Sequence, residues 1–310
     1  LNAELKLCLK TTVIFDFGCI EVLAEHIDSL QLQLEKEQEP VGIVSRQVED
    51  NSKLSNQAPV ELKTKAATLQ AGVDLRVRLK QPGGLDSIAL ESFTLVQPEG
   101  REVLVDVRAF SLNFGDWLCV QGLYPTMPEY PFTPGFELSG VVEAVGPDVE
   151  DLLVGDEVIA LTGAALGGQA TRVVVERDLV VRKPSSVSFE EAAAFPAVFL
   201  TSSHVMAKAQ LQPGDSILIQ TAAGGVGLIL VQMALAAGAR VFATAGSEAK
   251  LAYLRELGVE CVINYQTDDF ETAVRRHNRG HGVDVVINML SGDSIQKGLN
   301  LLEPDGRYVE

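Results

Sequence analysis

The sequence is poor in metal-binding residues and in positive charge. Its four histidines and four cysteines are scattered, and no two cysteines form a CxxC pair. Zinc sites need clustered Cys or His ligands, so we expect no metal site and treat the cysteines as structural. Lys and Arg total 25 against 42 Asp and Glu, a formal net charge of −17. This charge disfavours a nucleic-acid partner, whose phosphates it would repel.

Long apolar runs are also absent. No stretch is apolar over the roughly 20 residues that a membrane-spanning helix needs, and the start lacks a signal-peptide pattern. We therefore expect no membrane association and a cytoplasmic protein. Hydrophobic residues still make up 46% of the chain, enough for two modest cores. The chain begins without Met and ends inside a predicted strand, so we expect both ends to be cuts in a longer polypeptide.

Four zones are predicted along the chain. Residues 1–30 are too few to bury a core of their own, and the polar residues 31–71 are predicted to be a linker. Residues 72–195 are predicted to form an all-β domain, because short strand-like runs are separated by Gly and Pro; these runs are 73–79, 103–110, 139–145 and 171–175. Residues 196–310 alternate strands with helices. That alternation is typical of an α/β Rossmann domain with a doubly wound parallel sheet.

A glycine-rich motif is the sharpest local signal. The apolar run 216–220, a predicted strand, leads into Thr221-Ala222-Ala223-Gly224-Gly225-Val226-Gly227 and then into a helix predicted over 226–237. Glycine allows a tight turn and a close backbone approach to a pyrophosphate, while the start of the helix favours the anion. An ordinary strand-turn-helix has the same outline, but the alternating context favours dinucleotide binding. The predicted contacts are Ala223, Gly224, Gly225, Val226 and Gly227.

The end of the next predicted strand indicates whether NADPH or NADH is bound. It ends at residues 244–247 without the carboxylate that usually binds the ribose of NAD. Ser247 and Lys250 instead suit a ribose 2′-phosphate, and Tyr265 can add a third contact. The alternatives are a solvated Lys250, a Tyr265 that is only a loop aromatic, and a Glu248 that serves as a displaced ribose acid. The pattern favours NADPH over NADH.

Several motifs together resemble the medium-chain dehydrogenase/reductase superfamily. They occupy residues 107–116, 135–142, 154–158 and 222–227, and the resemblance covers about residues 72–310. Within it, the chain resembles the branch of zinc-free quinone oxidoreductases and polyketide synthase enoyl reductases. Residues 111–117 contain no Cys or His, and Phe136 stands where a ligand His would stand. The resemblance implies a GroES-like substrate domain followed by the Rossmann domain.

The first zone resembles the C-terminal part of an acyl carrier protein domain. It lacks the helix that carries the phosphopantetheine serine, and we interpret Ser29 as unrelated to that serine. A carrier fragment joined to a reductase implies a megasynthase. The implied partners are the enoyl thioester on an acyl carrier protein, the other synthase domains, and a second copy in a homodimer formed through the parent synthase.

The resemblance also implies a reaction. The family transfers hydride from NADPH to the β-carbon of an enoyl thioester, and a proton then reaches the α-carbon. Tyr124 matches a tyrosine implied to be the donor or a determinant of stereochemistry, although it could be a packing residue. Lys250 and Asp269 match other proposed donors, with a phosphate contact and a helix N-terminal acid as their respective alternatives.

Asn113 and Thr201 match residues that bracket the nicotinamide, and Glu137 is interpreted as structural. Gly115 departs from the Asn-Phe-Arg-Asp sequence that is frequent in such reductases. Two other functions stay open: a stand-alone type of NADPH quinone or enone oxidoreductase, and a catalytically silent structural or binding module.

Overall fold

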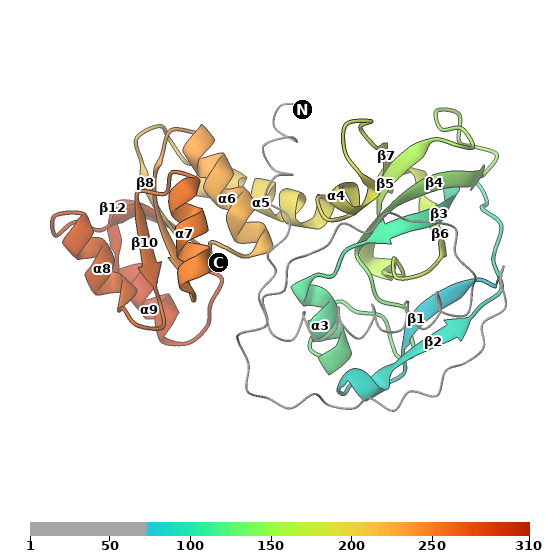
Figure 1. Ribbon diagram of the computed structural model, residues 1–310, viewed down its shortest axis with the longest axis horizontal. Coiled ribbons are helices and arrows are strands. Elements are labelled where there is room, and N and C mark those ends of the chain that lie inside the picture. The colour runs from blue at the N-terminus through green and yellow to red at the C-terminus, as the bar shows by residue number, and fades with distance from the viewer. Residues whose placement is uncertain (1–72) are drawn as a thin grey trace.

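The computed structural model describes residues 73–310, which form two lobes joined by a helical segment (Figure 1). The carrier-like zone 1–30 and the linker 31–71 lie outside the described residues. One lobe is rich in antiparallel strands, and the other alternates strands and helices. None of the helices within residues 73–310 is long and apolar enough to cross a membrane.

The first lobe is built on an antiparallel sheet in the order β6-β3-β4-β5-β7. Side chains alternate between the faces of a strand, so Val103 and Val105 of β3 share a buried cluster with Leu138 and Val142 of β4. The hairpin of β1 and β2 packs beside this sheet. The strands are β1 (Leu75–Leu79), β2 (Ile88–Ser92), β3 (Glu102–Phe110), β4 (Glu137–Val145), β5 (Glu157–Leu161), β6 (Arg172–Glu176) and β7 (Val180–Arg182).

The strand-rich lobe also contains α-helices, the first of which the all-β expectation left out. Helix α3 (Phe114–Gln121) lies between β3 and β4, and α4 (Phe189–Ala193) follows β7. The sequence of α3 does not predict a helix, because it contains Phe, Gly and Trp, which are weak helix formers, and because the runs on either side are strand-like. The helix is instead started by Asp116, whose carboxylate accepts the backbone N–H of Asn113 at 2.8 Å.

The second lobe contains a five-stranded parallel sheet in the order β10-β9-β8-β11-β12, which confirms the predicted Rossmann architecture. Ile217 and Ile219 of β8 pack into the same cluster as residues of α6 and α7, whereas Leu218 faces the cluster that contains Phe270 of α8. The elements are β8 (Ser216–Ile219), α6 (Gly225–Ala236), β9 (Arg240–Ala245), α7 (Glu248–Glu256), β10 (Cys261–Asn264), α8 (Phe270–His277), β11 (Val283–Ile287), α9 (Asp293–Asn300) and β12 (Leu302–Val309).

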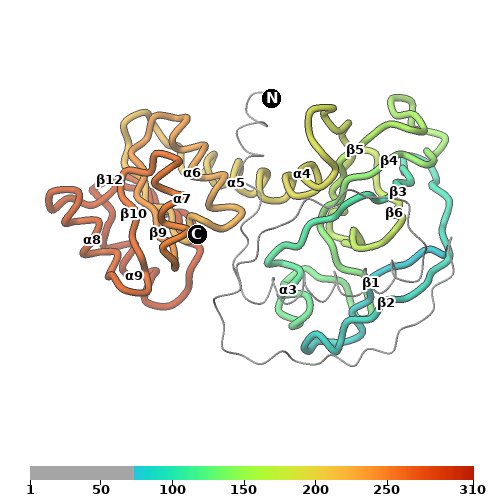
Figure 2. The backbone as a smooth tube through the Cα atoms, in the orientation of Figure 1, coloured from blue at the N-terminus to red at the C-terminus, as the bar shows by residue number. Residues whose placement is uncertain are grey.

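Helix α5 (Pro196–Ala209) connects the lobes, and the chain trace in Figure 2 passes from one to the other through α4 and α5. Proline at its first position has no N–H that would need a partner inside the helix. Val198 and Phe199 of α5 pack against Ile229 of α6, which holds the helix on the Rossmann lobe. The predicted division between residues 195 and 196 coincides with the start of α5; the domain limits themselves stay a prediction.

Candidate functional site

The glycine-rich motif forms a tight loop between β8 and α6. The Thr221 N–H donates to Oγ1 of Thr244 at 3.1 Å, and the Ala222 N–H donates to the Thr244 carbonyl at 2.9 Å. Thr221 has a φ of 46°, in the left-handed region. A Cβ added to Gly227 would lie 2.5 Å from the Thr221 carbonyl oxygen, so only glycine allows the helix to start so close to the loop.

A pocket opens beside this loop and contains several of the predicted nucleotide contacts. Ala223 and Gly224 come from the loop, while Lys250 comes from α7 and Tyr265 follows β10. Sequence reasoning missed the other lining residues. The complete lining is Thr221, Ala223, Gly224, Ala245, Gly246, Lys250 and Tyr265. It includes one cation and no carboxylate, next to the amino end of α6. These features fit the phosphates of a dinucleotide.

The remaining contacts predicted in the Rossmann lobe lie next to this pocket without lining it. Gly225, Val226 and Gly227 form the first turn of α6, and Ser247 is the N-cap of α7. A Cβ on Gly246 would lie 2.5 Å from the Tyr265 hydroxyl, so that glycine makes room for the tyrosine. Gly246 could not be predicted as a site residue from the sequence, because only the fold brings Tyr265 against it.

Glu248 and Asp269, both in the Rossmann lobe, are ion-paired. Glu248 accepts from Arg255 at 2.6 Å at the surface of α7, which weakens its interpretation as a displaced ribose acid. Asp269 is the N-cap of α8, accepts the Thr272 N–H at 2.9 Å and pairs with Lys297. The hydrogen bond from Lys297 lowers the pKa of Asp269 to about 2. An ionised carboxylate has no proton to give at neutral pH, so this environment favours the capping role over the donor role.

In the first lobe, three donors converge on the carboxylate of Glu137. Asn113 Nδ2 donates to Oε1 at 2.9 Å, the Ala197 N–H donates to Oε2 at 2.7 Å, and the Ser111 hydroxyl donates to Oε1. Glu137 is fully buried, and burial raises its pKa. Thr201, one turn beyond Ala197, is exposed and donates its hydroxyl to the Ala197 carbonyl at 2.7 Å.

A second buried carboxylate, Asp116, lies near this group. It accepts the N–H of Asn113 at 2.8 Å, the N–H of Gly135 at 3.0 Å and Nε2 of Gln169 at 3.1 Å. Desolvation outweighs these hydrogen bonds and raises the pKa of Asp116 from 3.8 to about 7. The carboxylate stabilises the loop geometry around Asn113, but keeping it ionised in the interior costs stability.

That cost predicts a pH dependence of stability. A pKa raised on folding means that the native state holds its proton more tightly, so the contribution of Asp116 falls as pH rises from 3.8 to about 7. The lost stability is on the order of 4 kcal/mol. Asp116→Asn should make the decline in unfolding free energy over this range shallower in denaturant titrations at several pH values. An unchanged slope would contradict the raised pKa.

Tyr124 lies in the loop after α3 and is half-buried. Its ring packs edge-on against Phe136, with 5.2 Å between ring centroids and 72° between planes. Gly115 makes room for this pair, because a Cβ there would lie 2.7 Å from the Phe136 ring. The Tyr124 hydroxyl has no hydrogen-bond partner among residues 73–310, so the ring is held while its polar end stays available.

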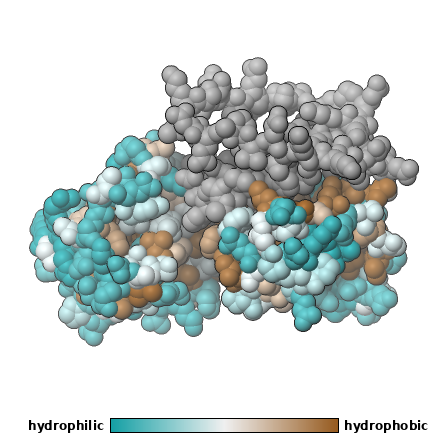
Figure 3. Space-filling view, turned by 90° about the horizontal axis from the view of Figure 1, so that it is seen from below, coloured by the Kyte–Doolittle hydropathy of each residue, from teal (hydrophilic) through white to brown (hydrophobic). Residues whose placement is uncertain are grey.

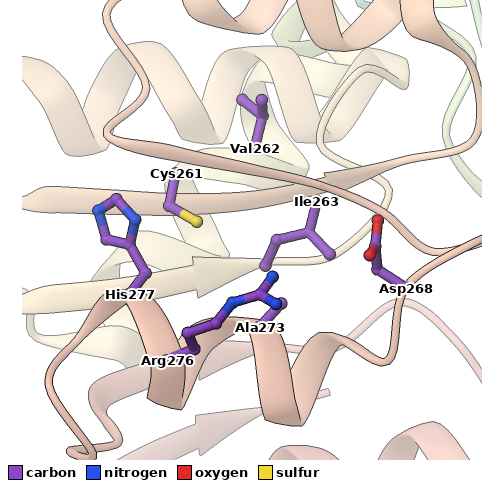
Figure 4. Close-up of a pocket in the computed structure, with 7 residues that line it drawn as sticks. All are labelled: Cys261, Val262, Ile263, Asp268, Ala273, Arg276 and His277. Atoms are coloured by element: carbon purple, nitrogen blue, oxygen red, sulfur yellow. The ribbon is translucent and has the colours of Figure 1, made fainter.

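A different pocket lies at the edge strand β10, between that strand and α8 (Figure 4). Figure 4 shows His277 and Arg276 reaching from α8 toward the strand. Its lining shares no residue with the nucleotide pocket; it consists of Cys261, Val262, Ile263, Asp268, Ala273, Arg276 and His277. No predicted site residue belongs to it. Within residues 73–310, no group of three His, Cys, Asp or Glu side chains is placed to hold a metal.

Comparison with known proteins agrees with this arrangement. Residues 99–185 match the family described as "Alcohol dehydrogenase GroES-like domain", and residues 225–310 match that described as "Zinc-binding dehydrogenase". One component of the phenolphthiocerol/phthiocerol polyketide synthase of Mycobacterium tuberculosis is 39% identical over 237 residues, which are 76% of this chain and 11% of that protein. The chain thus spans about a tenth of the length of the synthase component that it matches.

Solved structures give the same assignment. The CurK enoyl reductase is 37% identical with a TM-score of 0.71, over 76% of this chain and 73% of that one. A quinone oxidoreductase of Pseudomonas syringae pv. Tomato DC3000 is 34% identical with a TM-score of 0.71, over 76% and 72% of the two chains. The chain therefore belongs to the medium-chain dehydrogenase/reductase superfamily and contains an enoyl reductase domain of the polyketide synthase type.

Proposed function

We propose that this domain uses NADPH to reduce the carbon–carbon double bond of a trans-2-enoyl thioester carried by an acyl carrier protein. The supporting observation is a pair of features on the two lobes. One lobe has a phosphate loop beside Lys250, in a pocket whose described lining has no carboxylate, and the other presents the Tyr124 hydroxyl, which has no partner among residues 73–310. The similarity to the CurK enoyl reductase supports the same reaction.

Different residues of the chain would bind the nucleotide and donate the proton. The loop Ala223–Gly227 and the Ser247, Lys250 and Tyr265 group would hold the nucleotide, with Asn113 and Thr201 beside its nicotinamide. NADPH, when bound, supplies the hydride for the β-carbon. The electron pair of the double bond then moves toward the α-carbon and the thioester oxygen, and Tyr124 donates its proton to the α-carbon. The tyrosinate that remains regains a proton from solvent.

The substrate's acyl chain needs an apolar surface. Exposed hydrophobic side chains occur on both lobes, and Figure 3 shows hydrophobic residues among the mostly hydrophilic surface of one face. The exposed hydrophobic residues include Phe114 at the start of α3, Leu123 next to Tyr124, and Leu200 next to Thr201. These neighbours of the predicted site residues Asn113, Tyr124 and Thr201 would contact the acyl chain. We propose that other domains of a megasynthase deliver the substrate and that the parent synthase forms a homodimer.

The direct test is NADPH oxidation, followed by absorbance, with an enoyl-pantetheine thioester as the acceptor. Turnover of the thioester with little turnover of quinones supports the proposal. The similarity to a quinone oxidoreductase makes that enzyme class the second candidate. Preference for a quinone would favour it, and failure to oxidise NADPH with either acceptor would favour a silent structural module.

The choice of nucleotide gives a separate prediction. Lys250→Ala should lower the preference for NADPH over NADH by about tenfold, because a charged hydrogen bond to a phosphate contributes about 1.5 kcal/mol or more. Affinities for both nucleotides can be measured by fluorescence titration. Glu248→Gln is the matched control on the same helix. Glu248 pairs with Arg255, so this variant should keep the preference of the wild type for NADPH over NADH. A loss of NADH affinity in the control would identify Glu248 as a ribose ligand.

A further inference from the structure

The two oxygens of Glu137 serve different lobes. Oε1 accepts Asn113 Nδ2 at 2.9 Å and the Ser111 hydroxyl, both next to α3 in the strand-rich lobe. Oε2 accepts the Ala197 N–H at 2.7 Å, in the first turn of α5. Because α5 packs on α6 of the Rossmann lobe, one fully buried carboxylate connects the two lobes.

The connection continues to Thr201. Its hydroxyl donates to the Ala197 carbonyl at 2.7 Å, so hydrogen bonds run from Asn113 through Glu137 and Ala197 to Thr201. A buried charge is costly unless several donors satisfy it, and here three do. Inside a poorly polarisable interior such bonds are strong and lack competing water. This series of hydrogen bonds is therefore suited to hold Asn113 and Thr201 at a fixed distance.

We propose that Glu137 is a positioning residue that sets the spacing between Asn113 and Thr201, and thereby the placement of the nicotinamide between the lobes. The inference rests on the proposed function, in which those two residues lie beside the nicotinamide. A shift of about 1 Å in the placement of a reacting group can lower a rate by about 100-fold. The nucleotide's phosphates, in contrast, are held by the loop before α6, which Glu137 does not contact.

Glu137→Gln separates these two roles. The amide keeps the size of the side chain but turns one acceptor into a donor that faces donors. We expect hydride transfer in a single turnover to slow by about 10- to 100-fold, with NADPH affinity little changed. Transfer from deuterium-labelled NADPH should also lose facial selectivity. Ser139→Ala is the matched control on the same strand, since the Ser139 hydroxyl is buried and donates to the Phe189 carbonyl instead of to Glu137, and the variant should keep rate and selectivity.

A measurement without cofactor or substrate tests the link itself. Amides in the first turn of a helix usually lack a partner and exchange with solvent quickly. The Ala197 amide should be protected in wild type and in Ser139→Ala, and less protected in Glu137→Gln. If Glu137→Gln fails to fold, Glu137→Asp shortens the side chain and should show the same pattern with a smaller effect.

The results distinguish this inference from the proposed function. Rapid exchange of the Ala197 amide in wild type would overturn the link, whatever the substrate is. A protected amide together with a Glu137 variant that transfers hydride as fast and as selectively as Ser139→Ala would overturn the positioning role. An absence of thioester reduction by the wild type would instead contradict the proposed function, and amide exchange would still test the link.

Discussion

Replacing Gly227 with alanine is expected to weaken nucleotide binding by about 10- to 100-fold, corresponding to about 1–3 kcal/mol of overpacking. The new Cβ would lie 2.5 Å from the Thr221 carbonyl oxygen and 2.7 Å from Cα of Ala222. Both are backbone atoms, so no side chain can rotate away to relieve the contact. The loop must move off α6, and its amides would then no longer face a pyrophosphate together.

Affinity for NADPH, measured by fluorescence titration, checks this prediction. Gly83→Ala is a suitable control in the other lobe, because a Cβ there makes an ordinary contact of 3.6 Å with the Ser87 side chain. It should leave both affinity and thermal stability near those of wild type. Gly227→Ala with undiminished affinity, in a protein that is still folded, would show that this loop does not hold the nucleotide.

The Rossmann lobe could be predicted well because its signals are local. The predicted strand 216–220 and helix 226–237 agree with β8 (Ser216–Ile219) and α6 (Gly225–Ala236) within one residue at each end. In the strand-rich lobe the predicted runs were found, but β2, β5 and β7 were missed. Those strands have five, five and three residues, too few for an alternating pattern to stand out.

The site residues also differ in whether their signals are local in the sequence. The nucleotide loop is continuous in sequence, so its residue types and order were sufficient to predict it. The link from Glu137 to Ala197 spans 60 positions, and nothing in the residues between them indicates it. The partner of Asp269 is 28 positions away at Lys297, so the sequence suggested a helix cap but not the ion pair that keeps it charged. Contacts of this kind depend on the fold.

Replacing Tyr124 with phenylalanine is expected to slow enoyl reduction by about 100-fold, the lower range for loss of a general acid. Phenylalanine keeps the ring that packs on Phe136, so the fold and NADPH affinity should not change. If a water molecule supplies the proton instead, the product of an α-substituted substrate should form in both configurations. Single-turnover kinetics and chiral analysis of the product measure these two effects.

Tyr130→Phe is the matched control for that variant. The Tyr130 hydroxyl donates to the Cys119 carbonyl, so its loss should cost about 1 kcal/mol of stability without changing rate or configuration. If Tyr124→Phe retains full rate and configuration, the proton has another source. Because Asp269 is held ionised by Lys297, Lys250 would then be the remaining candidate of the three, and Lys250→Ala should lower the rate of protonation as well as the preference for NADPH.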